Sequence, residues 1–174
     1  MPKKTNQWIL LSVLALILIL AAIIFIPIEK RIVFIDNREG TLTAFIKAEN
    51  HAFQINYTHS IHLSEVLESY KILPDNRIRM VELEYEDFNI GMPSNAGEGE
   101  TFVEKDGKYL ITNMKREVDD FRLFVGDVDA HLFFLADGHQ YDLKKTLERG
   151  KSYTIKVQRV SLFEQLEGVS LNER

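Results

Sequence analysis

The chain has 174 residues, of which 45% are hydrophobic and 27% charged, a composition typical of a folded protein rather than a disordered one. It contains no cysteine, which excludes disulfides, thiolate metal sites and a cysteine nucleophile. All 26 acidic residues and 19 of the 21 lysines and arginines follow residue 28, so this part carries a net charge of −7 with histidine neutral. Such a charge disfavours binding to nucleic-acid phosphates, and no nucleic-acid partner is expected.

Residues 8–28 form an apolar run in which Ser12 is the single polar residue and no charge occurs. As a helix that rises about 1.5 Å per residue, this run would span roughly 30 Å, the thickness of the hydrocarbon core. We therefore expect a transmembrane anchor over residues 8–28, preceded by a short cytoplasmic flank over residues 1–7. A cleaved signal peptide is the alternative, because Lys3 and Lys4 precede the run, but no small-x-small cleavage site follows it.

The charges on either side of the apolar run give little indication of orientation. Lys3 and Lys4 precede it, while Lys30 and Arg31 follow it, so the positive-inside rule is nearly balanced. The N-terminal flank is too short to fold, which favours an N-terminus inside and export of the larger part. The expected location is the cell membrane, single-pass, with a β domain over residues 32–160 outside the cytoplasm and a C-terminal tail over residues 161–174.

After residue 28 the hydrophobic pattern changes to the alternation that is typical of half-buried strands. In residues 81–86, for example, apolar side chains alternate with three glutamates, which predicts one buried and one acidic face. Two Asp-Gly pairs, at 106–107 and 137–138, predict tight hairpins. In chain order, the predicted strands are residues 32–35, 42–46, 53–58, 66–73, 81–86, 102–105, 108–112, 121–125, 132–136, 140–143 and 153–160.

About ten short strands without helical patterns between them predict an all-β fold, either an antiparallel β-sandwich or a partly open barrel. A parallel α/β sheet is disfavoured, because its strands would need helical crossovers. The tail from Ser161 could form a short helix, but its pattern is ambiguous. Residues 90–100 contain three glycines and one proline without periodicity, and so predict a long loop of a kind that often carries function.

The densest polar cluster is the stretch His-Ser-Ile-His-Leu-Ser-Glu at residues 59–65, with Glu68 three residues beyond it. Two histidines and two glutamates could bind zinc or another divalent ion. On a straight strand, however, His59 and His62 face opposite sides, so they converge only if the segment bends. The patterns of zinc proteases are absent, no cofactor is expected, and a metal site stays an open alternative.

Other catalytic chemistry finds little support in the sequence. Ser60 and Ser94 lack the G-x-S-x-G nucleophile elbow. The aspartate pairs at 119–120 and at 127 and 129 lack the glycine and glutamate that complete a calcium loop. No glycine-rich phosphate loop opens a helix. We therefore expect a protein that is not an enzyme.

Several short motifs resemble a known bacterial family. Tyr-Thr-His-Ser-Ile at 57–61, followed by Val66 and Glu68, is similar to the His-Ser-Val … Val-x-Glu signature of domain-of-unknown-function family 1850. Gly-Met-Pro-Ser-Asn-Ala at 91–96 and Asp-Gly-Lys-Tyr at 106–109 strengthen the resemblance, which covers most of residues 32–160. It implies a membrane-attached protein associated with TRAP-type transporters of the TAXI subclass, without an established activity. Many members carry an acidic residue where His62 stands.

The anchor, the acidic β domain and the family resemblance together predict a non-enzymatic accessory protein that assists a TRAP-type solute transporter. It would act through protein–protein contact with the permease or the solute-binding protein. The alternative is a module that binds or senses a small ligand or a metal ion through the segment from His59 to Glu68. The candidate binding or interaction residues come from this segment and from the 90–100 loop: His59, Ser60, His62, Glu68, Met92, Ser94, Asn95 and Glu98.

Overall fold

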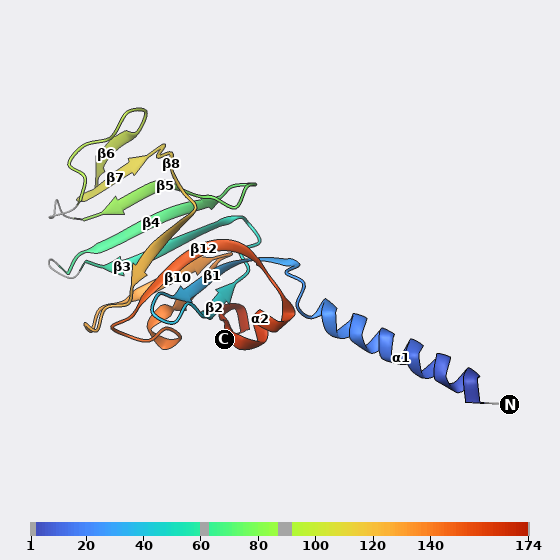
Figure 1. Ribbon diagram of the computed structural model, residues 1–174. Helices are drawn as coiled ribbons and strands as arrows, with labels where there is room; N and C mark the ends of the chain where they lie inside the picture. The colour runs from blue at the N-terminus through green and yellow to red at the C-terminus, as the bar shows by residue number, and fades with distance from the viewer. Residues whose placement is uncertain (1–2, 60–62, 87–91, 174) are drawn as a thin grey trace.

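Thirteen strands form two sheets in the part of the chain that the computed structural model describes, residues 3–59, 63–86 and 92–173 (Figure 1). In spatial order, the smaller sheet contains β13 (Val169–Ser170), β2 (Leu42–Ile46), β1 (Glu29–Asp36), β12 (Ser152–Val160) and β9 (Asp120–Phe124). The larger sheet contains β11 (His139–Asp142), β10 (Leu132–Ala136), β3 (Ala52–Thr58), β4 (Glu65–Ile72), β5 (Ile78–Tyr85), β7 (Lys108–Thr112) and β6 (Thr101–Lys105), with β8 (Arg116–Val118) paired to β5. Neighbouring strands are antiparallel, apart from the β13–β2 pair.

The prediction of an all-β antiparallel sandwich is confirmed. Each stretch of alternating residues that predicted a strand forms one, and two strands were not predicted. These are β8 and β13, which are three and two residues long. A period of two residues needs at least four positions to be recognised, so strands of this length leave no pattern in the sequence.

The main core contains a set of aromatic rings that crosses from one sheet to the other. Phe53 of β3 stacks on Phe134 of β10 and on Tyr70 of β4, with ring centroids 4.9 Å apart in both pairs. Tyr70 in turn stacks on Phe121 of the smaller sheet at 5.2 Å, and Phe34 of β1 meets Phe134 edge-on at 5.6 Å. Each such pair adds about 0.5–1.5 kcal/mol beyond the area that it buries. The two sheets are therefore held together by direct ring contacts.

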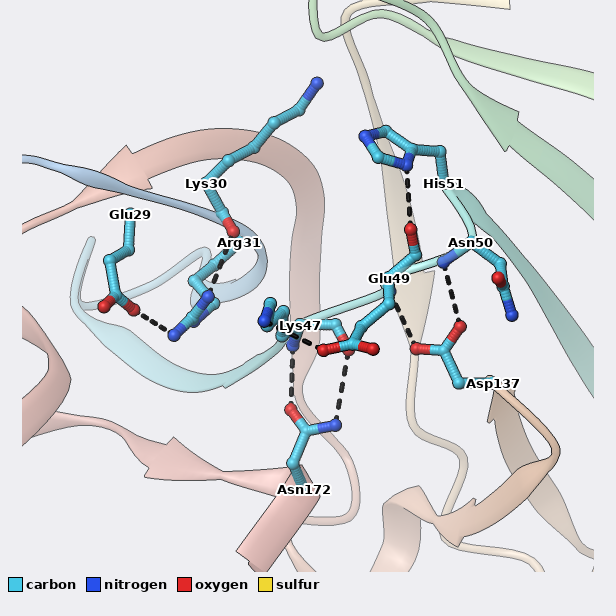
Figure 2. Close-up of polar contacts among 9 residues, drawn as sticks. All are labelled: Glu29, Lys30, Arg31, Lys47, Glu49, Asn50, His51, Asp137 and Asn172. Carbon is cyan, nitrogen blue, oxygen red and sulfur yellow. Dashed lines mark hydrogen bonds and ion pairs between the residues drawn. The ribbon is translucent and has the colours of Figure 1, made fainter.

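Both predicted Asp-Gly hairpins form. In β6–β7 the turn residues Asp106 and Gly107 have φ values of 55° and 78°, and in β10–β11 Asp137 and Gly138 have 52° and 78°. These are the left-handed conformations that a two-residue hairpin turn requires. Asp137 has a further role, because its carboxylate accepts the backbone N–H groups of Glu49 at 2.8 Å and of Asn50 at 3.0 Å (Figure 2). It thereby fixes the β2–β3 connection to the β10–β11 turn.

The two hairpins supply a matched pair of variants, since Asp106 and Asp137 occupy equivalent turn positions. We expect Asp137→Ala to lower the free energy of unfolding by about 1–3 kcal/mol more than Asp106→Ala, because it also removes two hydrogen bonds to a charged acceptor. Urea unfolding of both variants measures the difference. Equal losses would contradict the role assigned to Asp137.

The N-terminal helix α1 (Lys3–Ile23) extends away from the sheets (Figure 1). Every described side chain between residues 7 and 29 is exposed. The helix ends ahead of Pro27, which has no N–H to donate and disfavours helical geometry at the residue before it. The predicted span over 8–28 is thus helical as far as Ile23. Among the residues that the structure describes, no helix is long and apolar enough to cross a membrane.

The C-terminal tail, which was ambiguous in sequence, contains the short helix α2 (Leu162–Glu167). It begins at a capping box, in which the Ser161 hydroxyl accepts the Glu164 N–H at 3.2 Å and the Glu164 carboxylate accepts the Ser161 N–H at 2.7 Å. Gly168 then turns the chain back onto the smaller sheet, where a Cβ atom would lie 2.1 Å from a methyl carbon of Leu42. Strand β13 and the 3₁₀ helix η2 (Leu171–Glu173) follow.

Candidate binding site

A cavity of about 350 Å³ lies where β3 ends. Its walls come from residues 57–59, from the chain between Leu123 and Leu132, and from Lys144. In Figure 1 this end of β3 lies on the side of the sheets away from α1. The cavity therefore belongs to the end of the domain that is farthest from the N-terminal helix.

Pairing of β3 with β10 brings the two principal walls together. Tyr57 lies opposite Leu132 in the register, which places Thr58 beside His131. The Thr58 hydroxyl is 3.0 Å from His131 Nδ1, and the Thr58 N–H donates to the His131 carbonyl at 3.3 Å. The His131 ring also stacks on Phe133, with centroids 5.1 Å apart. The imidazole is thus held by a hydroxyl on one side and by an aromatic ring on the other.

Lys144 closes the cavity from another part of the chain. It belongs to the 3₁₀ helix η1 (Leu143–Lys145), which begins where the Asp142 carboxylate accepts the Lys144 N–H at 3.0 Å. The Lys144 ammonium donates to the carbonyl of Val128 at 2.8 Å. This bond supports the loop between β9 and β10 that forms the outer wall.

Large apolar side chains are exposed beside this cavity. Phe124 and Val128, which both line it, are 64% and 53% exposed. Leu63 is 73% exposed, and its N–H donates to the carbonyl of the cavity residue His59 at 2.9 Å. Leu63 also has a φ of 58°, a conformation that is costly for a leucine. Exposed apolar groups next to a cavity and a strained backbone residue are both features of interaction sites.

A half-buried carboxyl group lies behind the cavity wall. Glu68 of β4 accepts the Tyr57 hydroxyl at 3.2 Å and the Tyr70 hydroxyl at 2.5 Å. Among the described residues, no lysine, arginine or histidine forms an ion pair with it. Burial raises the pKa of Glu68, and the two tyrosine hydrogen bonds lower it by less. Tyr57 belongs both to this group and to the cavity, so it connects the carboxyl with the cavity.

The tyrosine hydroxyls remain donors over the physiological pH range. Burial raises the pKa of Tyr57 and of Tyr70, and the neighbouring Glu68 carboxylate raises both further. The group of two phenols and one carboxyl can therefore hold a proton or release it at Glu68, while the phenols stay neutral.

The raised pKa of Glu68 has a defined consequence for stability. Below the ordinary value of 4.5 the carboxyl is protonated in both the folded and the unfolded chain, so burial has no charge to disfavour. As the pH rises through the folded-state pKa, a charge forms in the folded protein and the free energy of unfolding decreases. Glu68→Gln removes this titration and still offers the two hydroxyls a carbonyl oxygen and an NH2 group. We therefore expect the stability of the variant relative to wild type to increase between about pH 4 and pH 8.

Urea unfolding across that pH range measures this difference. Glu104→Gln, at an exposed position of β6, is the control for the loss of one negative charge. A constant difference between wild type and Glu68→Gln at all pH values would show that burial does not perturb the carboxyl.

The predicted site residues are only partly brought together. His59 lines the cavity, and Glu68 reaches it through Tyr57. Met92 is half-buried and packs on a second apolar cluster formed by β4, β5 and β7. Exposed positions that do not line the cavity are Ser94, Asn95 and Glu98. Ser60 and His62 lie outside the described residues.

The predicted loop over 90–100 contains neither helix nor strand in its described part, from residue 92. It is fixed at both ends. The Tyr85 hydroxyl donates to the carbonyl of Pro93, and the Glu100 carboxylate accepts the Gly97 N–H at 2.7 Å. The Gly97 hydrogen bond lowers the pKa of the Glu100 carboxyl, and the guanidinium of Arg116, 3.3 Å away, lowers it further.

Residues 3–59, 63–86 and 92–173 contain no arrangement of side chains that would support metal binding. No three histidine, aspartate or glutamate side chains there lie close enough to hold an ion. His131 Nε2 comes within 3.8 Å of Glu65, but no third ligand joins this pair.

Sequence reasoning did not identify Thr58, Phe124, Val128, His131 or Lys144 as site residues. Thr58 stands beside the predicted His59 and could have been included. The other four lie more than sixty residues further along the chain, and the β3–β10 register, the position of β9 in the other sheet and the position of η1 bring them to β3. Pairing register between distant strands is not written in the local pattern.

The fold and the cavity define a two-sheet antiparallel β-sandwich protein with a candidate binding site at one end. The family described as a domain of unknown function (DUF1850) matches residues 53–143, and the chain belongs to this family. The matched stretch includes every cavity residue except Lys144. No curated protein and no solved structure matches the chain.

Proposed function

We propose that this chain is a non-enzymatic accessory protein, anchored in the cell membrane by its N-terminal segment, that contacts a partner protein through the cavity beside Tyr57. The observation that carries the proposal is the set of exposed apolar side chains, Leu63, Phe124 and Val128, around a cavity at the end of the domain away from α1. The motif resemblance favours a component of a TRAP-type solute transporter, the permease or the solute-binding protein, as the partner.

The apolar N-terminal run supports attachment to a membrane. From Trp8 to Ile28 its large apolar side chains are 39% to 71% exposed, so the described residues leave much of their apolar surface uncovered. The helical part from Trp8 to Ile23 covers about 24 Å at 1.5 Å per residue. Residues 24–28 are also apolar and extend the run towards the roughly 30 Å of a hydrocarbon core. In this proposal the N-terminus is inside and the β domain is outside the cytoplasm.

The composition of the cavity mouth favours a protein partner. Interface residues with large energetic contributions are enriched in aromatic side chains and arginine, and they fill well-packed, desolvated pockets. A space of about 350 Å³ accommodates one such side chain of a partner, while Phe124 and Val128 pack around it. Because both residues are already exposed, a partner can bury them without any rearrangement of the sheets.

The test is co-purification of TRAP components with tagged, detergent-extracted full-length protein. We expect the double variant Phe124→Asp, Val128→Asp to lose at least tenfold in partner recovery, equivalent to about 1.4 kcal/mol, and solute uptake to fall with it. Val103→Asp is the matched control, since Val103 is 40% exposed on β6 and outside the cavity lining. Retained recovery in the double variant would contradict the proposed contact surface.

Leu63 offers a variant that separates binding from folding. Asparagine tolerates positive φ better than leucine, so Leu63→Asn is expected to keep or raise the thermal midpoint and still weaken partner recovery. If wild-type protein recovers no transporter component, and deletion leaves uptake unchanged, the accessory function is wrong.

The second candidate function is binding of a small organic ligand in the same cavity. The observation that favours it is that polar side chains such as Thr58 and His131 and apolar side chains such as Leu132 line one cavity, which is typical of ligand pockets. A thermal-shift screen of the full-length protein against carboxylates, small aromatic compounds and divalent metals tests it. A ligand that raises the midpoint should lose its effect in Thr58→Val and keep it in Thr112→Val, on β7. A screen without any stabilising compound would count against this function.

A further inference from the structure

Helix α2 has an apolar face that the described residues leave largely exposed. Leu162, Phe163 and Leu166 are 49%, 39% and 82% exposed, and none of the six residues of this helix is buried. Leu162 and Leu166 are four residues apart and therefore lie on the same side of the helix. Helices in folded proteins are normally stabilised by packing an apolar face, so the exposed Leu162 and Leu166 are suited to a contact outside the chain.

The position of α2 indicates what that partner is. The Phe163 N–H donates to the carbonyl of Ile24 at 3.1 Å, and the Phe163 ring lies 4.9 Å from that of Phe25. The Ile28 N–H donates to the carbonyl of Val160, which directly precedes the capping residue of α2, at 3.2 Å. Helix α2 is thus attached to the last residues of the apolar N-terminal run, and Figure 1 shows it on the α1 side of the sheets. Its exposed face continues the apolar surface of that run.

A groove of about 920 Å³ lies beside α2, and its lining includes Leu162 and Leu166 of this helix together with Arg31 and Lys47. These two cations are neutralised locally: Arg31 pairs with Glu29, and Lys47 lies 2.9 Å from Glu49 (Figure 2). Electrostatic attraction to anionic headgroups therefore contributes little here. The surface is suited to a contact driven by apolar burial.

We propose that α2 is an interfacial helix, whose residues Leu162, Phe163 and Leu166 insert into the boundary between headgroups and acyl chains of the membrane that holds the N-terminal segment. This inference rests on the proposed anchor. Six residues bury too little apolar surface to bind a membrane alone, but attachment to the anchor gives α2 a high effective concentration at the surface. The β domain would then have two contacts with the membrane, and the cavity would be held on the opposite side.

The chain has no cysteine, so a single cysteine can report on one position. Leu166→Cys, in the full-length protein, is labelled with an environment-sensitive fluorophore and incorporated into phosphatidylcholine vesicles. We expect its emission to shift to shorter wavelength and to be quenched by brominated acyl chains. Val103→Cys, on the β6–β7 hairpin, is the matched control and should show neither effect. Replacing part of the phosphatidylcholine with an anionic lipid should not increase the quenching.

Flotation of the vesicles separates the two hypotheses. If the protein floats but the Leu166→Cys label is not quenched, the interfacial helix is wrong and the anchor stands. If the protein does not float, both are wrong. Formation of a disulfide-linked dimer by unlabelled Leu166→Cys in the vesicles, without quenching of the labelled form, would instead assign the apolar face to a second copy of the chain. Because Leu166 is 82% exposed, the substitution itself leaves the packing of the domain unchanged.

Discussion

The pairing of β1 with β12 is the interaction on which the rest of the structure depends. These strands come from opposite ends of the chain and match over eight consecutive residue pairs, from Glu29–Val160 to Asp36–Tyr153. Together they form the centre of the smaller sheet and present Phe34 and Ile155, both fully buried, to the larger one. Without them the inner face of the larger sheet, including its stacked aromatic rings, would be open to water.

This dependence explains why the family match and the folded unit have different limits. The matched residues 53–143 supply nearly all of the larger sheet and the strand β9. They do not include β1, β2 or β12, which cover the core. An isolated sheet with one uncovered apolar face is marginally stable at best, so the physical domain must extend beyond the matched stretch on both sides.

Much of the fold could be predicted from the sequence, because alternation and Asp-Gly turns are local signals. The glutamate-bearing face of residues 81–86 and the left-handed turn residues Asp106 and Asp137 are examples. The candidate site was harder to predict from the sequence. Glu68 and Tyr70 lie two residues apart and so share a face, but Tyr57 joins them through the β3–β4 register, in which Glu68 lies opposite Ile55. His131 contacts Thr58, 73 positions away, and Lys144 lines the same cavity as Thr58. Such contacts depend on the whole topology rather than on any short pattern.

The direct continuation of the N-terminal segment into β1 determines how the domain would bear a load. A force that draws the β domain away from an anchored N-terminus acts along β1, whose neighbours on both sides are the antiparallel strands β2 and β12. Hydrogen bonds between antiparallel strands run perpendicular to the strands, so this force shears many of them at once rather than opening them one after another. With the N-terminal segment anchored as proposed above, β1 would therefore resist extraction through both of its neighbours at once, and a pull on the β domain would load the centre of the smaller sheet before it reached the core.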